Sequence, residues 1–380
     1  MSICLILAIM IAIKNGKFFL KDELVTNRVI LVKDGKIVDV DGNGVPAGYR
    51  EIDARGAYIN PGFIDLQIYG SGGHLFSAYP SADTLRQMDA DLISKGTTGF
   101  LACVATNTPE VVHQSIIAAK EYRDDAKAFL GLHLEGPYLN AKRRGAHIEE
   151  YVRKASLEEV KRLMEHSDGT VKMMTIAAEL QDDEVIHYLL DQGIVLSLGH
   201  SDATFDEATK AYNMGITSTT HLFNAMPSIH HRAPNLPVAL FNHPTAMASI
   251  IADGNHVDFE VVKMSYKLMQ ERLFLITDAV TPCHIGPYQH QLSGDKFITA
   301  DGTLSGSNIT LLQAVQNCVR HCDVPLNSAF QMATLNPARL MKLDDRTGNL
   351  RAGCQADLLF LSDDLELIRI FKDGKEYAKV

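Results

Sequence analysis

The sequence lacks the short patterns that assign a chain to several common enzyme classes. It has no Walker A loop, no G-x-G-x-x-G dinucleotide fingerprint and no G-x-S-x-G nucleophile elbow. The segment "GSGGH" at residues 70–74 follows an expected strand, but it has neither the Rossmann spacing nor the later acidic residue. These absences argue against the common nucleotide-binding folds and against a serine hydrolase.

An excess of basic residues is also missing. The chain has 36 Lys and Arg against 46 Asp and Glu, a formal net charge of −10 with histidines neutral. An acidic chain is a poor nucleic-acid binder, so an anionic substrate requires a local binding cluster. The apolar run near the N-terminus covers about twelve residues, too few for a membrane span, and lacks the basic start of a signal peptide. We expect no nucleic-acid partner and no membrane segment, with the chain starting at Met1 or Met10.

Paired cysteine motifs are absent as well. The six cysteines are scattered, and no C-x-x-C occurs. Cys318 and Cys322 are four residues apart on an expected helix, where cysteine usually serves as a small buried apolar residue. Free thiols without a secretory context indicate a reducing compartment, and we expect a cytoplasmic protein.

The pattern of expected strands indicates two structural parts. Both ends of the chain are rich in short β-type runs broken by Asn-Gly or Asp-Gly turns. The middle alternates short apolar strands with helical stretches, which is typical of a parallel sheet. Eight strand candidates can be counted in the middle, enough for a (β/α)8 TIM barrel of about 250 residues or somewhat more. We therefore predict a small β-sandwich domain from residues 1–58 and 347–380, and a catalytic barrel over residues 59–346.

Polar residues at the ends of these strands predict a site at the mouth of the barrel. Seven of the eight candidates end this way, and in such barrels catalytic side chains gather at the C-terminal ends of the strands. Glu135, His200 and His221 come from three different strands. Each alone is more often a capping or satisfied polar residue, but together they form a ligand set for a catalytic divalent ion, Zn²⁺ first, with Fe²⁺ and Co²⁺ also accepted. The seven strand-end residues are Asp65, Glu135, Glu179, His200, His221, Asp253 and Asp278. Among them, Asp65 is expected to be a structural acid or one that supports the metal ligands.

Other polar residues suggest the reacting groups. Asp278 ends the last strand, where a carboxylate next to a metal-activated water could act as general base and acid; its alternative role is a helix cap. His147 and His256 are candidates for polarising a carbonyl or holding an anion, and Arg232 could bind a phosphate with two hydrogen bonds. The loop "GTLSGSNITLL" most simply begins a capped helix.

In this order the motifs resemble those of N-acetylglucosamine-6-phosphate deacetylases of the amidohydrolase superfamily. They are "PGFIDLQIYGSGG", "GLHLEGPYLNAKRRGAH", "LGHSDATFDEA", "THLFNAMPSIHHRAPN", "IIADGNHVD", "LITDAVTP", "GTLSGSNITLLQAV" and "MATLNPARLM". In many amidohydrolases the first motif carries two metal-binding histidines, where this chain has Gln67 and Tyr69. The resemblance is to a branch with one metal ion per subunit, which leaves open a weak second ion near Gln67. The loop "TPCHIGPYQHQ" and the pair His230–His231 depart from the expected pattern.

The resemblance implies the barrel and terminal sandwich described above, and a metal site at Glu135, His200 and His221 with Asp278 as general base and acid. It implies a homodimer in which Arg232 or His256 completes the phosphate site of the neighbouring subunit. The implied substrate contacts are Ala146, His147, Asn224, Ala225, Arg232, His256, Leu304, Ser305 and Gly306.

The implied reaction is deacetylation of N-acetyl-D-glucosamine 6-phosphate in amino-sugar catabolism, yielding D-glucosamine 6-phosphate and acetate. Three alternatives stay open. The same chemistry could act on N-acetylgalactosamine 6-phosphate, because one inverted hydroxyl needs only one or two loop changes. Another single-metal amidohydrolase could cleave a different amide. A catalytically silent barrel could serve as a binding protein, although the four intact residues Glu135, His200, His221 and Asp278 argue against it.

Overall fold

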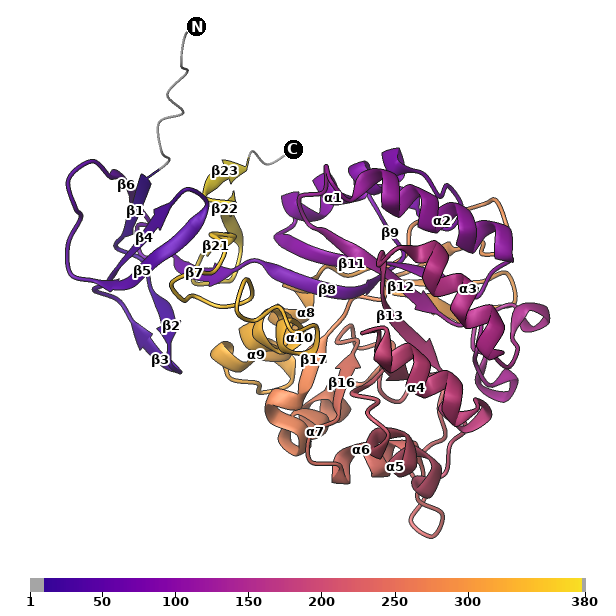
Figure 1. Ribbon diagram of the computed structural model, residues 1–380. Coiled ribbons are helices and arrows are strands. Elements are labelled where there is room, and N and C mark those ends of the chain that lie inside the picture. The colour runs from indigo at the N-terminus through magenta and orange to yellow at the C-terminus, as the bar shows by residue number, and fades with distance from the viewer. Residues whose placement is uncertain (1–9, 378–380) are drawn as a thin grey trace, which may run out of the picture.

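Eight parallel strands, paired in chain order, form the centre of the molecule (Figure 1). The computed structural model describes residues 10–377, so Met1 lies outside the described residues. Beyond the last strand, Ala279 forms a parallel bridge with Ile68, and the Asp278 N–H donates to the Gln67 carbonyl at 2.9 Å. These contacts join the last strand to the first, and the predicted (β/α)8 barrel is confirmed. The strands are β8 (Phe63–Ile68), β11 (Thr97–Ala105), β12 (Phe129–Glu135), β13 (Val171–Ile176), β14 (Val195–Leu198), β15 (Ser218–Thr219), β16 (Met247–Ile250) and β17 (Leu273–Leu275).

Helices lie around the outside of the barrel, and their starts are defined by local sequence. Thr204 and Glu207 form a capping box at the start of α5, and Thr310 and Gln313 form another at the start of α8. The second box confirms the capped helix expected after "GTLSGSNI". The helices are α1 (Ala82–Ser94), α2 (Pro109–Tyr122), α3 (Leu157–Ser167), α4 (Asp183–Asp191), α5 (Phe205–Asn213), α6 (Leu236–Asn242), α7 (Phe259–Met269), α8 (Leu311–His321), α9 (Leu326–Ala333) and α10 (Leu335–Leu340).

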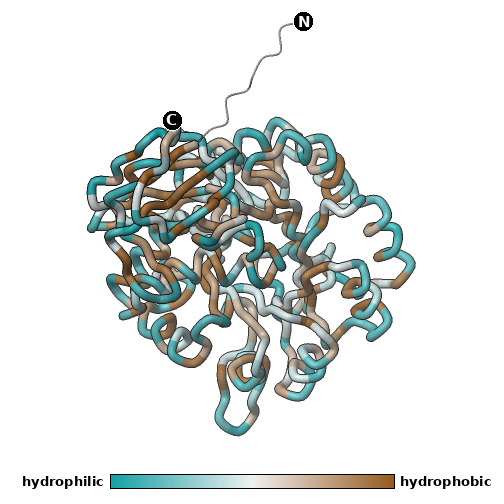
Figure 2. The backbone as a smooth tube through the Cα atoms, turned by 60° about the vertical axis from the view of Figure 1, so that its left-hand side comes forward, coloured by the Kyte–Doolittle hydropathy of each residue, from teal (hydrophilic) through white to brown (hydrophobic). Residues whose placement is uncertain are grey.

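The barrel strands are apolar because helices and barrel interior cover both of their faces. Every residue of β8, β11 and β12 is buried except the half-buried Leu130. Figure 2 shows brown, hydrophobic stretches inside the molecule and teal, hydrophilic stretches along its outer helices and loops. Among the described residues, no helix is long and apolar enough to cross a membrane.

Two four-stranded sheets form the predicted small β-domain, one built from the N-terminal part of the chain and the other from both ends. A shared apolar core joins them, with Ile11 and Ile30 from one sheet and Leu358, Phe360 and Phe371 from the other. The first sheet contains β1 (Met10–Lys14), β4 (Val29–Lys33), β5 (Lys36–Gly42) and β6 (Arg50–Asp53), and the second contains β7 (Tyr58–Pro61), β21 (Leu358–Leu361), β22 (Leu367–Lys372) and β23 (Lys375–Tyr377). A short ribbon, β2 (Phe18–Leu20) with β3 (Glu23–Val25), extends from this domain.

The predicted boundary between the small domain and the barrel falls inside a strand. Strand β7 belongs to the sheet of the small domain, and β8 of the barrel begins two residues after it. β7 therefore spans the boundary placed between residues 58 and 59. The domain limits 1–58, 59–346 and 347–380 stay a prediction.

A buried ion pair in the small domain offers a test of its stability. Lys372 Nζ lies 2.8 Å from Asp357 Oδ2, and both side chains are at most 6% exposed. Replacing Asp357 by Asn would leave the Lys372 ammonium without its buried counter-charge, which we expect to cost about 3 kcal/mol. Urea unfolding followed by circular dichroism measures this cost. Combining Asp357→Leu with Lys372→Met should recover most of the loss, whereas a single variant as stable as the wild type would contradict the prediction.

Candidate active site

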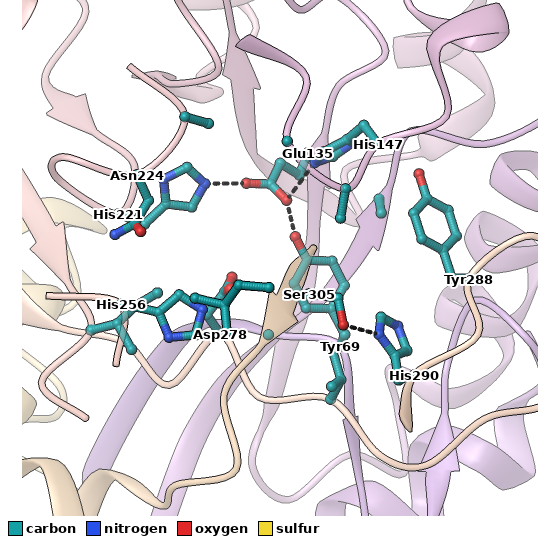
Figure 3. A pocket seen from close by; sticks show the side chains of 18 of the residues that line it. Tyr69, Glu135, His147, His221, Asn224, His256, Asp278, Tyr288, His290 and Ser305 are labelled. Atoms are coloured by element: carbon teal, nitrogen blue, oxygen red, sulfur yellow. Dashed lines mark hydrogen bonds and ion pairs between the residues drawn. The ribbon is translucent and has the colours of Figure 1, made fainter. Parts of the chain in front are cut away.

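Four of the predicted catalytic and metal-binding residues meet at the C-terminal mouth of the barrel. Figure 3 shows three of them, Glu135, His221 and Asp278. Glu135 is the last residue of β12. His200 and His221 each follow a strand by two residues, and Asp278 follows β17 by three. Because parallel strands end at the same rim, these four side chains line one cavity.

The backbone at this rim adopts a conformation that most residues avoid. His200, His221 and Asp278 have φ angles of +48°, +34° and +53°. Such left-handed residues cost on the order of 1–3 kcal/mol each and cluster at functional sites, where the surrounding structure holds them. The strained turns direct these three side chains into the cavity.

Glu135, His200 and His221 bring together three atoms of the kinds that bind divalent metal ions. Glu135 Oε1 lies 2.9 Å from His221 Nε2 and 3.3 Å from His200 Nε2, and the two imidazole nitrogens are 3.1 Å apart. His200 Nδ1 lies 2.8 Å from the Arg143 carbonyl, which can only accept. His200 therefore carries its proton on Nδ1 and turns the Nε2 lone pair toward Glu135, as a metal-ligating histidine does. One buried carboxylate and two imidazoles fit a divalent ion with an open position.

Gln67 and Tyr69 support the carboxylates of this site. Gln67 Nε2 lies 2.9 Å from Glu135 Oε1 and 2.8 Å from Asp278 Oδ1, so its amide links the two acids. The Tyr69 hydroxyl donates to Glu135 Oε2. The sequence identified Gln67 only as a poor metal ligand and gave Tyr69 no role. The sequence could not show that Gln67 and Tyr69 act as hydrogen-bond donors, because the acids that accept from them lie at or just after the ends of other strands.

The two buried acids differ in their electrostatic surroundings. Burial raises the pKa of Asp278 to about 6, and the nearby Glu135 charge adds to this effect. Burial acts in the same direction on Glu135, but its close contacts with the imidazoles of His200, His147 and His221 outweigh it and hold the pKa of Glu135 well below its usual value. Glu135 thus stays anionic, whereas Asp278 can exchange a proton near neutral pH.

His147 is held in the tautomer that donates a hydrogen bond from Nε2. The Thr106 N–H donates to His147 Nδ1 at 3.3 Å, so the ring proton of the neutral imidazole sits on Nε2. Nε2 lies 3.2 Å from Glu135 Oε2 at the edge of the metal-ligand group. His147 can therefore offer a proton to a substrate oxygen.

Most of the predicted substrate-binding residues line the same cavity. They are Ala146, His147, Asn224, Ala225, His256, Leu304, Ser305 and Gly306. Arg232 does not line it: this residue lies in an exposed stretch between β15 and α6. The phosphate role expected for Arg232 stays a prediction.

Three strand-end acids do not line the cavity, which is contrary to our expectation for Glu179 and Asp253 and consistent with the structural role expected for Asp65. Asp65 lies in the middle of β8, which continues to Ile68, and its carboxylate accepts hydrogen bonds from Thr277. Glu179 lies in a 3₁₀ turn after β13 and bonds Asn140, Ser201 and the Asp202 N–H. Asp253 bonds His256. These acids orient neighbouring loops instead of facing substrate, because each finds local donors.

The cavity also contains two side chains that the sequence did not single out, Tyr288 and His290. Both belong to the loop "TPCHIGPYQHQ", whose departure from the expected pattern was the only available signal. The exposed pair His230–His231 lies beside Arg232, outside the cavity.

A family model for the amidohydrolase family matches residues 58–377. The chain belongs to the amidohydrolase family. Within this family, the N-acetylglucosamine-6-phosphate deacetylase of Haemophilus influenzae is 31% identical over 382 residues, covering 96% of this chain and 98% of that protein. The human protein of the same name is 33% identical over 345 residues, covering 85% of this chain and 84% of that protein.

Solved amidohydrolase structures agree with this placement. The N-acetylglucosamine-6-phosphate deacetylase of Pasteurella multocida superposes with a TM-score of 0.92 at 31% identity, covering 97% of this chain and 100% of that one. A variant of the Mycobacterium smegmatis deacetylase in complex with N-acetyl-D-glucosamine-6-phosphate has a TM-score of 0.90 at 30% identity, with 97% and 99% covered. The resemblance inferred from the ordered motifs is confirmed.

Loss of one imidazole should remove the metal. We expect His221→Ala to lower divalent-ion content from about one per chain to well below one tenth, because three protein ligands become two. Elemental analysis after purification without chelator measures this, and His187→Ala, at an exposed position on α4, is the matched control. Full metal content in His221→Ala would exclude the proposed ligand set.

Proposed function

We propose that the chain hydrolyses N-acetyl-D-glucosamine 6-phosphate to D-glucosamine 6-phosphate and acetate. The observation that carries this proposal is the convergence of Glu135, His200 and His221 beside the buried Asp278. This convergence occurs in an amidohydrolase whose relatives over nearly the whole chain are deacetylases of that sugar phosphate. The reaction belongs to amino-sugar catabolism, and we place it in the cytoplasm.

Glu135, His200 and His221 would hold one divalent ion per subunit, Zn²⁺ first, with Fe²⁺ or Co²⁺ as alternatives. Such an ion lowers the pKa of a bound water and polarises the carbonyl to be attacked. The buried, anionic Glu135 favours a cation here. Gln67 and Tyr69 help to hold its two oxygens in place.

Asp278 is the proton carrier of the proposed reaction. Gln67 holds its Oδ1, while Oδ2 has no hydrogen-bond partner among the described residues and is left to exchange a proton. As general base, Asp278 takes a proton from the attacking water. As general acid, it returns this proton to the amine nitrogen, which would otherwise be a very poor leaving group.

The remaining predicted residues bind the two ends of the substrate. His147 donates from Nε2 to the acetyl oxygen as negative charge develops there. His256, oriented by a hydrogen bond of 2.7 Å between its Nδ1 and Asp253 Oδ2, is assigned to the phosphate. Arg232 of a neighbouring subunit would add a bidentate contact in a homodimer.

Replacing Asp278 by Asn should abolish turnover without emptying the metal site. Asn keeps the shape of the side chain and can still bond Gln67, but it cannot carry the proton. We expect kcat to fall on the order of 10²–10⁴-fold with metal content unchanged, measured by acetate release and elemental analysis. Asp191→Asn, on the exposed end of α4, is the control. Activity within tenfold of the wild type would rule out this role.

The phosphate should control substrate choice. We expect kcat/KM for N-acetylglucosamine 6-phosphate to exceed that for N-acetylglucosamine on the order of 100-fold, since one or two charge-assisted hydrogen bonds are lost without the phosphate. His256→Asn should reduce this preference. Equal rates on both sugars would refute the phosphate site, and release from neither would redirect the search to other amides.

A further inference from the structure

One wall of the cavity is formed by chain segments that follow Asp278. The loop 279–290 leads into a three-stranded antiparallel ribbon of β18 (Gln291–Ser293), β19 (Lys296–Ile298) and β20 (Leu304–Gly306). Cys283 and His290 exchange two backbone hydrogen bonds of 3.2 and 3.1 Å at the base of this loop. His290 therefore occupies a fixed backbone position although it follows an irregular segment.

The His290 side chain is held as firmly as its backbone. The residue is 4% exposed, and its Nδ1 lies 3.0 Å from Ser305 Oγ (Figure 3). The Tyr288 ring stacks near the imidazole with 6.4 Å between centroids, and the Tyr288 hydroxyl donates to the Thr106 carbonyl at 2.5 Å. The Nε2 atom of His290 has no hydrogen-bond partner within residues 10–377. The imidazole is therefore held in one orientation, with Nδ1 bonded to Ser305 and Nε2 available to bond a ligand.

Ser305 is positioned relative to the reaction centre. The Ser307 N–H donates to the Asp278 carbonyl at 3.0 Å, which ties β20 to the backbone of the proposed base. Gly306, at a φ of +138°, permits this approach, because an added Cβ would lie 2.7 Å from a Val280 methyl group and 3.0 Å from the Asp278 carbonyl. A substrate hydroxyl group that contacts Ser305 is therefore held in a defined position relative to the amide bond to be cleaved.

The chemistry of this wall suits a hydroxyl better than a phosphate. Burial lowers the pKa of His290 to about 4, so the ring is neutral under physiological conditions and offers one donor and one acceptor. An oriented pair of this kind, with His290 buried and Ser305 half-buried, strongly disfavours a substrate that leaves it unpaired. A phosphate would require positive charge, and the cavity wall at His290 and Ser305 provides none.

We propose that His290 is a specificity-determining residue that orients the Ser305 hydroxyl. Together the two side chains hydrogen-bond a ring hydroxyl of the sugar, and this contact distinguishes the gluco from the galacto epimer. The inference rests on the proposed deacetylase function and extends it to the choice of sugar.

The test measures kcat and KM for acetate release from the 6-phosphates of N-acetylglucosamine and N-acetylgalactosamine. We expect the wild type to favour the gluco epimer. His290→Phe, which keeps an aromatic ring but removes both nitrogens, should reduce the ratio of the two kcat/KM values at least tenfold, mainly through KM. Ser305→Ala should have a similar effect, and the double variant should add little to either. His284→Phe, at an exposed position of the same loop, is the matched control and should leave the ratio unchanged.

A rescue variant separates positioning from simple packing. His290→Asn retains a hydrogen-bonding atom near the position of Nδ1, so it should keep more of the epimer ratio than His290→Phe. If His290→Phe fails to fold, as judged by circular dichroism, Ser305→Ala and His290→Asn carry the test. An unchanged ratio, additive effects of the two substitutions, or a wild type without epimer preference would overturn the proposal. A wild type that deacetylates neither sugar would instead refute the deacetylase function itself.

Discussion

The buried carboxylate of Glu135 is the constraint around which the site is organised. A carboxylate without solvent is costly unless hydrogen bonds and opposite charge compensate it. Here both oxygens are satisfied by side chains that arrive from different strands and loops, and these partners keep the acid ionised despite its burial. The cavity that remains beside it is suited to a cation. The side chains that contact this carboxylate are Gln67, Tyr69, His147, His200 and His221.

The barrel provides the rigidity that this arrangement requires. Strand ends are fixed by the parallel ladder on either side, so left-handed turns at His200, His221 and Asp278 can be held against their intrinsic cost. Close packing next to these turns adds to the restraint. An added Cβ at Gly199 would lie 2.6 Å from a Thr175 methyl group and 2.8 Å from Thr220 Cβ. The residue before His200 must therefore be glycine for the imidazole to reach Glu135.

The walls of the cavity come from longer segments between the strands. The segment 136–153 contributes Ala146 and His147, and the segment after Asp278 contributes Tyr288, His290 and Ser305. A reaction centre built on strand ends can stay constant while such loops change, which is how one barrel supports many substrates. We therefore expect residues of these loops to determine which sugar is bound.

The sequence by itself determined the barrel and the terminal β-domain, because apolar periodicity depends on local order along the chain. It also placed Glu135, His200, His221 and Asp278 among the polar residues at strand ends. It could not show that β8 continues past Asp65, since Gln67 becomes favourable inside the barrel only when Glu135 and Asp278 stand opposite its amide. Only the tertiary structure decided which polar residues face the cavity. Glu179 and Asp253 look like Glu135 along the sequence, yet they bond to nearby loops, whereas Tyr288 and His290 enter the cavity from an irregular segment. The physical reason is that a polar side chain turns toward the partners that satisfy it, and those partners are brought near by folding from distant parts of the chain.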